Sequence, residues 1–130
     1  MNTKISRELA QHRLEQANED LAASKLLYEK KFYKSANNRA YYSIFHSIKA
    51  VLALEPIDFK KHKDVIAYFN KNYVKTEIFP KVIGHKIAEA TSLREDSDYD
   101  DEFIVNPDET LLQIQTAEEL IRLAKDYINK

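Results

Sequence analysis

The sequence predicts an all-α protein, an antiparallel bundle of about five helices, and three observations favour this fold class. Glycine occurs once and proline three times in 130 residues, so residues that interrupt helices are scarce. Apolar residues recur at steps of three and four over most of the chain, as they do on one face of an α-helix. No stretch alternates apolar with polar residues or carries a hairpin turn, so we expect no strand. At this length, the helices should share one core in a single domain over residues 1–130.

The first two helices are expected at about residues 4–30 and 35–54, with a short turn at residues 31–34 between them. Helical spacing in the first is kept by Leu14, Ala17, Leu21, Ser24 and Tyr28. Pro56 ends the second helix, because the residue before a proline avoids helical backbone angles.

Three further helices should complete the bundle. A short third helix is expected from near His62 to Tyr73, and Pro80 suits the first turn of a fourth. The fifth has the clearest start, because Asn106 can cap it, Pro107 fits its first turn and Glu109 completes a capping-box pattern. Helical spacing in the fourth is kept by Ile83, Ile87, Ala90 and Leu93, and in the fifth by Leu111, Ile114, Ala117, Ile121, Ala124 and Ile128.

Composition and charge exclude several classes of function. Twenty basic residues against 21 acidic ones leave a formal charge of −1, so any contact with RNA must come from a local patch. The absence of cysteine excludes disulfides, thiolate nucleophiles and cysteine-ligated zinc, and one glycine cannot form a glycine-rich phosphate loop. The sequence has neither a signal peptide nor a transmembrane run, so we expect a cytoplasmic protein without membrane contact.

An acidic segment at residues 94–102 carries six carboxylates, with aspartates at alternate positions as in a calcium-binding loop. Asp101 stands where that loop requires glycine, however, and Pro107 stands where it requires glutamate. We therefore expect a solvated acidic loop in which Arg94 pairs with Asp98. Neither a metal ion nor another cofactor is expected.

Arg39 and His46 are unusual residues in the second helix. They are seven positions apart, so they should lie two turns apart on one face, opposite the predicted core face. Core positions on this helix are Ala40, Tyr41, Ile44, Ile48, Val51 and Leu52. We expect the outward face to carry Arg39 and His46 with Ser43 between them, Ala50 and Ala53 below and Tyr42 at the side. Small residues let another helix come close, so this face predicts a homodimer through the second helix.

A histidine beside an arginine can perform metal-independent cleavage of RNA. The histidine can move a proton to or from a ribose hydroxyl, and the arginine can hold the phosphate and stabilise charge in the transition state. Arg39 and His46 are thus the candidate catalytic residues, and Asn38, Tyr42 and Ser43 are candidate contacts for substrate. The alternative is structural: an arginine paired to a carboxylate and a histidine bonded to a backbone carbonyl.

A basic cluster precedes the third helix. Lys61, His62 and Lys63, with Lys60 before them, are candidate contacts for a phosphate backbone. The alternative is a solvated loop.

Four stretches of the chain resemble the HEPN domain family. They are "FYKSANNRAYYSIFHSIKAVL", "KKHKDVIAYFNKNYVKT", "LREDSDYDDEF" and "TAEELIRLAKDYI", which together cover much of the chain. Catalytic members of the family have an arginine, four to six residues and then a histidine on a helix that faces a dimer partner. Arg39 and His46 match this pattern. Many catalytic members also have a polar residue directly after the arginine, where this chain has Ala40.

The resemblance implies a HEPN-like four-helix up-and-down bundle plus a short helix, and it implies two kinds of function. One is an endoribonuclease that acts as the toxin of a toxin–antitoxin pair, with a minimal nucleotidyltransferase as antitoxin. The other is a non-catalytic nucleotide- or RNA-binding module that acts through protein partners. The resemblance also implies that Arg94, Asp98 and Tyr99 have structural roles, with Tyr99 inside the domain.

Overall fold

The computed structural model describes residues 3–130 and, within that range, contains helices and no strand. The helices are α1 (Thr3–Glu29), α2 (Tyr33–Leu52), α3 (His62–Phe69), α4 (Lys81–Tyr99) and α5 (Pro107–Ile128), and a π-helical turn, η1 (Asn70–Val74), follows α3 directly. The prediction of an all-α fold is therefore confirmed.

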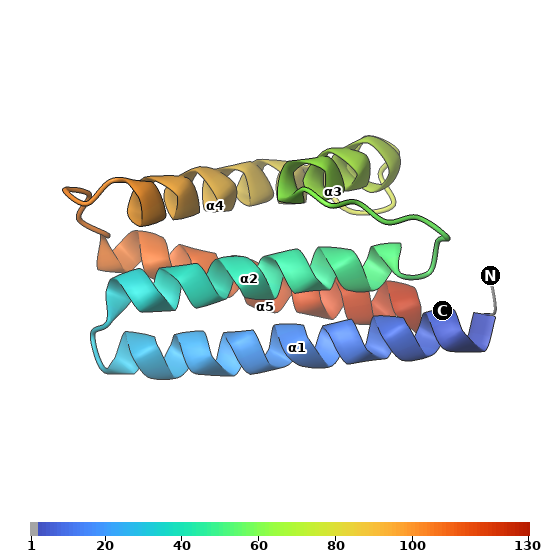
Figure 1. Ribbon diagram of the computed structural model, residues 1–130, viewed down its shortest axis with the longest axis horizontal. Coiled ribbons are helices and arrows are strands. Elements are labelled where there is room, and N and C mark those ends of the chain that lie inside the picture. The colour runs from blue at the N-terminus through green and yellow to red at the C-terminus, as the bar shows by residue number, and fades with distance from the viewer. Residues whose placement is uncertain (1–2) are drawn as a thin grey trace.

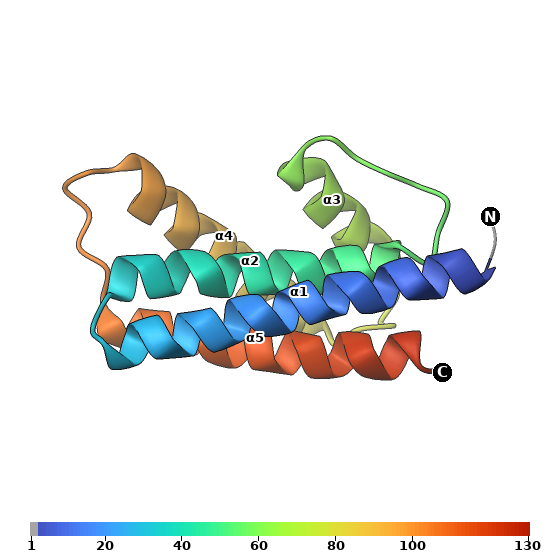
Figure 2. The same ribbon diagram turned by 60° about the horizontal axis from the view of Figure 1, so that its bottom comes forward.

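Four long helices alternate in direction, and the short α3 is inserted between two of them. Along the bundle, α1, α2, α4 and α5 run up and down in turn (Figure 1). A second view shows α1, α2 and α5 side by side, with α3 and α4 crossing them at an angle (Figure 2). The predicted up-and-down bundle of four helices plus a short one is confirmed.

Small residues let α1 and α2 pack closely along their length. On α1, Ala10, Ala17 and Ser24 repeat at seven-residue intervals, and all three are fully buried. The Ser24 hydroxyl donates a hydrogen bond to the backbone carbonyl of Ala36 at 2.6 Å, and the Ser43 hydroxyl donates to the carbonyl of Ala17 at 2.8 Å. Such short side chains reach the backbone of a neighbouring helix only when the two helices lie close together. The relative position of α1 and α2 is thereby fixed.

The central helix of the bundle is α2, which contacts α1, α3, α4 and α5. Its predicted core face is buried as expected. Every residue of that face is at most 4% exposed: Ala40, Tyr41, Ile44, Ile48, Val51 and Leu52. Because four helices surround α2, only a narrow strip of its surface remains for contact with a ligand.

Helix boundaries differ from the prediction by a few residues. The chain reverses at Lys31, whose φ is 66°, and this tight turn lets α2 begin at Tyr33, earlier than predicted. Regular α-helix ends at Phe69, and the rest of the predicted third helix is the π turn. The predicted cap of the last helix is confirmed, because the Asn106 side chain accepts a hydrogen bond from the backbone N–H of Asp108.

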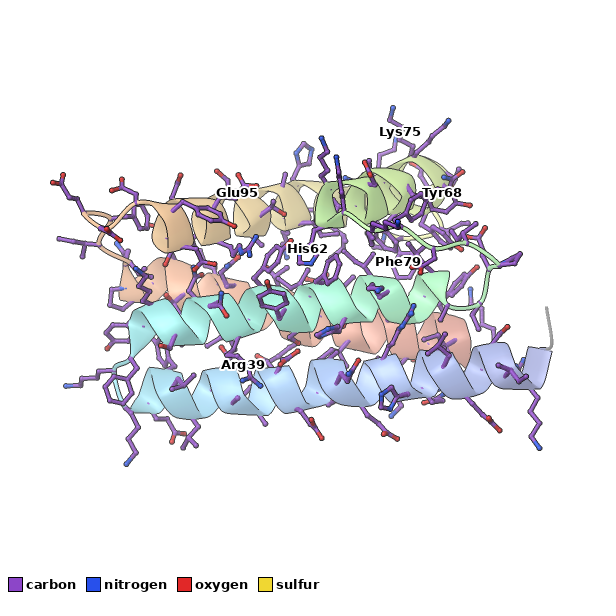
Figure 3. All side chains as sticks on the ribbon, viewed as in Figure 1. Arg39, His62, Tyr68, Lys75, Phe79 and Glu95 are labelled. Carbon is purple, nitrogen blue, oxygen red and sulfur yellow. The ribbon has the colours of Figure 1, made fainter. Side chains whose placement is uncertain are left out.

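Glu55, which follows α2, ties α3 and η1 to the end of α2. Its carboxylate accepts a hydrogen bond from the Tyr68 hydroxyl at 2.7 Å and another from the Tyr73 hydroxyl. Burial, together with this hydrogen bond, raises the pKa of Tyr73 well above its usual value, so Tyr73 stays a donor at neutral pH. Since α3 begins at His62, this anchor also helps to place His62 over α2 (Figure 3).

Replacing Glu55 with alanine should lower the free energy of unfolding by about 1–3 kcal/mol, because the largely buried Tyr73 hydroxyl loses its acceptor. Urea denaturation followed by circular dichroism measures the change. The matched control is Glu77→Ala, which removes an exposed carboxylate paired with Lys81 and should change stability little. Equal losses in the two variants would contradict an anchoring role for Glu55.

Candidate functional site

One strip of α2 is left partly exposed, between α1 on one side and α3 and α4 on the other. It is formed at helical spacing by Asn38, Arg39, Tyr42, His46 and Lys49. Arg39 and His46 lie two turns apart, as predicted, and both reach toward α1 at the edge of the strip. This strip is the candidate functional site.

The predicted outward stripe of small residues is buried inside the protomer. Ser43 is fully buried, and its hydroxyl donates a hydrogen bond to the carbonyl of Ala17 on α1. Ala50 and Ala53 are buried as well. The prediction that these three residues face outward is wrong, and Ser43 has no exposed surface with which to contact a substrate. The physical reason is that the small residues on α2 serve the close approach of α1 rather than of a second copy.

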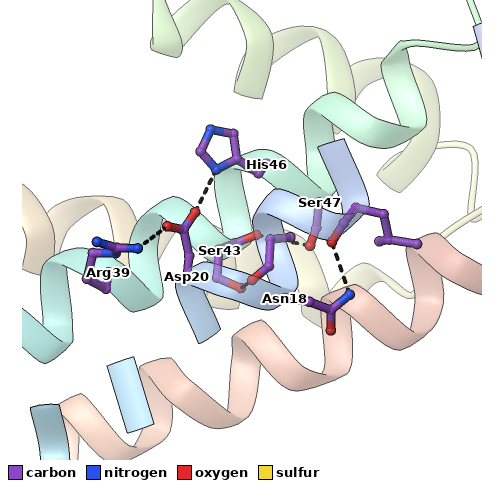
Figure 4. A network of polar contacts seen from close by, with 8 residues as sticks. Asn18, Asp20, Arg39, Ser43, His46 and Ser47 are labelled. Carbon is purple, nitrogen blue, oxygen red and sulfur yellow. Dashed lines mark hydrogen bonds and ion pairs between the residues drawn. The ribbon is translucent and has the colours of Figure 1, made fainter. Parts of the chain in front are cut away.

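Asp20 of α1 joins the two candidate catalytic residues (Figure 4). One carboxylate oxygen lies 2.9 Å from Nη2 of Arg39, and the other lies 2.7 Å from Nδ1 of His46. The Asp20 side chain is 12% exposed, whereas those of Arg39 and His46 are 43% and 27% exposed. A largely buried carboxylate therefore holds two basic side chains whose outer parts reach solvent.

This arrangement leaves each basic group with capacity for a ligand. An ionised carboxylate only accepts hydrogen bonds, so Nδ1 of His46 carries the hydrogen that points to Asp20. Among residues 3–130, Nε2 of His46 has no hydrogen-bond partner, and it is free to exchange a proton. Arg39 uses Nη2 for the ion pair, and no other nitrogen of its guanidinium is bonded within the described chain. Arg39 is paired to a carboxylate, as the structural alternative expects, but His46 binds the same carboxylate rather than a backbone carbonyl.

A pocket of about 480 Å³ opens beside Arg39. Its wall includes Lys34, Ser35 and Asn38 of α2, with Leu27 of α1 and Asp98 of α4. Lys34 adds a second cation to the guanidinium of Arg39. The pocket therefore offers space for a phosphate group next to two cations, Lys34 and Arg39, and the carboxylate in its wall, Asp98, is paired with Arg94.

Aromatic rings form the side of the strip that faces α3. The imidazole of His62 lies against Phe45, with 4.0 Å between ring centroids. The Tyr42 ring is close to both imidazoles, 5.8 Å from that of His62 and 6.2 Å from that of His46. Phe45 is also 6.0 Å from the His46 ring. His46 and His62, which are distant in the sequence, thus border the same pair of aromatic rings.

Arg94 of α4 fastens this aromatic group to the rest of the bundle. Its Nε donates to Asp98 at 2.9 Å, which confirms the predicted pair, although residues 94–99 form the end of α4 and the prediction of a loop there is wrong. Its Nη2 donates to the Tyr42 hydroxyl at 3.1 Å. The guanidinium carbon lies 5.0 Å from the centroid of the Tyr41 ring. Burial raises the pKa of the Tyr41 hydroxyl, so Tyr41 remains a neutral ring beneath the cation.

His62 has a perturbed pKa because of where α3 places it. Partial burial lowers its pKa below the usual value, and the positive charges of Arg94, Lys49 and His46 lower it further. His62 is therefore a neutral imidazole at pH 7. Within the described chain, neither of its ring nitrogens has a hydrogen-bond partner, so both can meet a ligand.

The other predicted residues lie at the edge of the pocket or on the surface. The amide nitrogen of Asn38 donates to Asp98 at 3.0 Å, so Asn38 joins α2 to α4 at the edge of the pocket. Lys61 and Lys63 are exposed on both sides of His62. Tyr99 is 76% exposed, so its expected place inside the domain is wrong; it contacts Arg94 from the surface.

Asp20 is the site residue that sequence reasoning missed. The signal is its position, three residues after Ala17 and four before Ser24, which puts a carboxylate on the packing face of α1. A carboxylate on such a face requires a cationic or hydrogen-bonding partner, since burial of an unpaired charge is costly. The sequence does not show which residue of another helix supplies that partner.

No group of three histidine, aspartate or glutamate side chains among residues 3–130 is arranged to hold a metal ion. In the same part of the chain, no helix combines the length and the apolar character that crossing a lipid bilayer requires.

Comparisons with known proteins agree on one family. The model of the HEPN domain matches residues 10–127 of this chain. A Methanocaldococcus jannaschii protein named "Putative toxin MJ0605" is 41% identical over 96 residues, which are 74% of this chain and 72% of that protein. Another from the same organism, "Putative toxin MJ0142", is 34% identical over 130 residues, or 100% of this chain and 83% of that protein. A "UPF0332 protein" of Thermotoga maritima is 36% identical over 83 residues, or 64% and 63% of the two chains.

The lowered pKa of His62 should make stability depend on pH. As the pH falls below about 6.5, the unfolded chain binds a proton at this position before the folded protein does, so the free energy of unfolding decreases. His62→Gln should reduce this decrease, measured by urea denaturation at pH 7 and at about pH 5. His85→Gln, at an exposed position of α4, is the control and should keep the wild-type pH dependence. A wild-type dependence in His62→Gln would rule out this source of pH sensitivity.

Proposed function

This chain belongs to the HEPN domain family, and we propose that it is a cytoplasmic, metal-independent endoribonuclease that acts as the toxin of a toxin–antitoxin pair. The observation that carries the proposal is the Arg39–Asp20–His46 group, in which two partly exposed basic side chains share one largely buried carboxylate. The two archaeal relatives named as toxins support the biological role.

The chemistry requires a proton acceptor or donor and a cation at one phosphate. Arg39 holds the scissile phosphate with its free N–H groups and stabilises the negative charge that builds up on the phosphoryl oxygens. His46 exchanges a proton through Nε2, while Asp20 keeps the hydrogen on Nδ1 and fixes the plane of the ring. The 2′-hydroxyl of the ribose attacks the adjacent phosphate and the 5′-oxygen leaves, so DNA is not a substrate.

Residues beside this group extend the contact with RNA. Lys34, in the pocket next to Arg39, and the exposed Lys61 and Lys63 contact phosphates on either side of the cleaved bond. The Tyr42 ring, which borders both histidines, packs against a base or ribose. These contacts supply a local positive patch on a chain whose formal net charge is −1.

The protein is proposed to form a homodimer through the partly exposed strip of α2, so that the two active sites open into one groove. The partner surface is then polar and aromatic, because the small residues of α2 are covered by α1. A minimal nucleotidyltransferase, the partner implied by the family resemblance, is proposed as the antitoxin.

A non-catalytic RNA-binding module is the second candidate. It is favoured by Ala40, which stands directly after Arg39 where many catalytic relatives have a polar residue, and which is fully buried. In this case the same cations bind RNA, and His46 contributes contact rather than proton transfer.

The central test is cleavage of RNA by the purified protein in the presence of a metal chelator. Arg39→Ala and His46→Ala should each lower the cleavage rate by at least about 100-fold, because one loses charge stabilisation and the other proton transfer. The matched controls, Arg122→Ala and His85→Ala, remove an exposed arginine of α5 and an exposed histidine of α4 that are not bonded to Asp20, and they should cleave as the wild type does. Expression of the wild type, but not of the two site variants, should slow bacterial growth. RNA that is bound and left intact by the wild type would favour the second candidate.

Replacing Asp20 with asparagine should lower kcat by about 100-fold with a smaller change in KM, because the amide has no charge and only one acceptor oxygen and so cannot hold both His46 and Arg39. Asp20→Glu keeps the charge and should restore part of the rate, and the pH profile of kcat should change in Asp20→Asn. Asp126→Asn, on the surface of α5, is the control. A wild-type pH profile and rate in Asp20→Asn would show that Asp20 has no positioning role.

A further inference from the structure

We propose that His62 is the second proton-transfer group of the same active site: it accepts the proton of the 2′-hydroxyl, and His46 donates a proton to the leaving 5′-oxygen. This inference rests on the proposed ribonuclease function and deepens it, because it makes the site of each protomer complete. His62 was singled out in the sequence only as a member of a basic cluster, and the folded chain brings it to the candidate site.

The first argument is the position of His62 relative to His46. α3 places the His62 ring on Phe45, 4.0 Å between centroids, and the same Phe45 ring is 6.0 Å from His46. Tyr42 borders both imidazoles at 5.8 and 6.2 Å. Both imidazoles therefore border the same two aromatic rings, Tyr42 and Phe45, and a phosphodiester bound at these rings lies near both histidines.

The second argument is that His62 is available for a ligand. Its ring is partly exposed, and among residues 3–130 its nitrogens make no hydrogen bond. It is held instead by ring contacts with Phe45, Tyr42 and Tyr41, which position the ring without using its nitrogens. Because the ring is partly exposed, its nitrogens can exchange a bound water for a ligand.

The third argument is the difference in charge between the surroundings of the two histidines. Around His62 the charged groups are cationic: Arg94 from α4, with Lys49 and His46 from α2, and burial and these charges lower its pKa. His46 instead donates Nδ1–H to the carboxylate of Asp20, so an anion lies against its ring. When two titratable groups lie in such different surroundings, the one among cations suits the base and the one beside a carboxylate suits the acid.

The proton balance of the step follows from this assignment. The 2′-oxygen forms a bond to phosphorus as its proton passes to a ring nitrogen of neutral His62. The bond from phosphorus to the 5′-oxygen breaks as Nε2 of protonated His46 gives its proton to that oxygen. The products are a 2′,3′-cyclic phosphate and a 5′-hydroxyl, and no oxidant, metal or co-reactant is consumed. Exchange with water returns each histidine to its starting state.

The test uses His62→Phe, which retains an aromatic ring against Phe45 but cannot accept a proton. We expect kcat/KM for RNA cleavage to fall at least about 100-fold while RNA affinity and the thermal unfolding midpoint stay near wild type. In wild type, kcat/KM should fall as the pH drops through the lowered pKa of His62, and this acidic limb should be absent in the variant. His62→Gln is the second variant, for use should phenylalanine unfold the protein, and His85→Phe is the control.

A substrate with an activated leaving group separates the two roles. Uridine 3′-(4-nitrophenyl phosphate) releases a nitrophenolate that needs no proton, so it bypasses a general acid but not a general base. We expect His46→Ala to recover most of the wild-type rate on this substrate and His62→Phe to remain slow. Recovery of His62→Phe, or an unchanged pH profile for its RNA cleavage, would overturn the role of His62 and leave the Arg39–His46 proposal standing. Absence of RNA cleavage by the wild type would overturn the proposed function itself.

Discussion

A carboxylate on α1 reaches two basic side chains on α2 because the two helices pack closely through small residues. Ala17 and Ser24 lie on either side of Asp20 along the buried face of α1, and Ser43 donates a hydrogen bond across to the backbone of α1. Larger residues at this interface would hold the two helices farther apart, and Asp20 could not then contact both Arg39 and His46. The cost of placing a carboxylate there is offset by the two charge-assisted hydrogen bonds that it accepts. The candidate site is therefore a product of helix packing rather than of α2 alone.

A second consequence of this packing is that the two sides of the exposed strip of α2 differ in chemistry. Its α1 side carries Arg39 and His46, which share an anion, and its α3 side carries aromatic rings surrounded by cations. Arg94 connects the two halves, since it bonds both to Asp98 at the pocket and to the hydroxyl of Tyr42. An extended anionic ligand that follows the strip would pass from the pocket, across Arg39, to the rings. This direction matches a polymer that alternates phosphates with flat bases.

Residues close together in the sequence predicted the helices, whereas contacts between different helices determine the geometry of the candidate site. The cap at Asn106 and the buried face of α2 depend on residues close together in the sequence, so spacing and capping preferences were sufficient. The pairing of Asp20 with Arg39 and His46 joins residues on different helices, and no periodicity reveals it. The wrong orientation of Ser43 has a related cause. A small, weakly polar residue fits equally well against a helix of its own protomer or of another, so its type does not identify the neighbour.

His62 of the short helix α3 adds a second imidazole beside the candidate site on α2. α3 has eight residues, too few to be stable alone, and it depends on contacts with α2 and on the hydrogen bonds of Glu55 to η1 and α3. Those contacts partly bury an imidazole close to the cations of α2 and α4, and burial together with these charges lowers its pKa and keeps it neutral. The protonation state of His62 is thus set by tertiary structure, just as the tautomer of His46 is set by Asp20. Because both settings depend on side chains from other helices, Asp20 of α1 and Arg94 of α4, an arginine and a histidine at the right spacing on α2 specify only part of the candidate site.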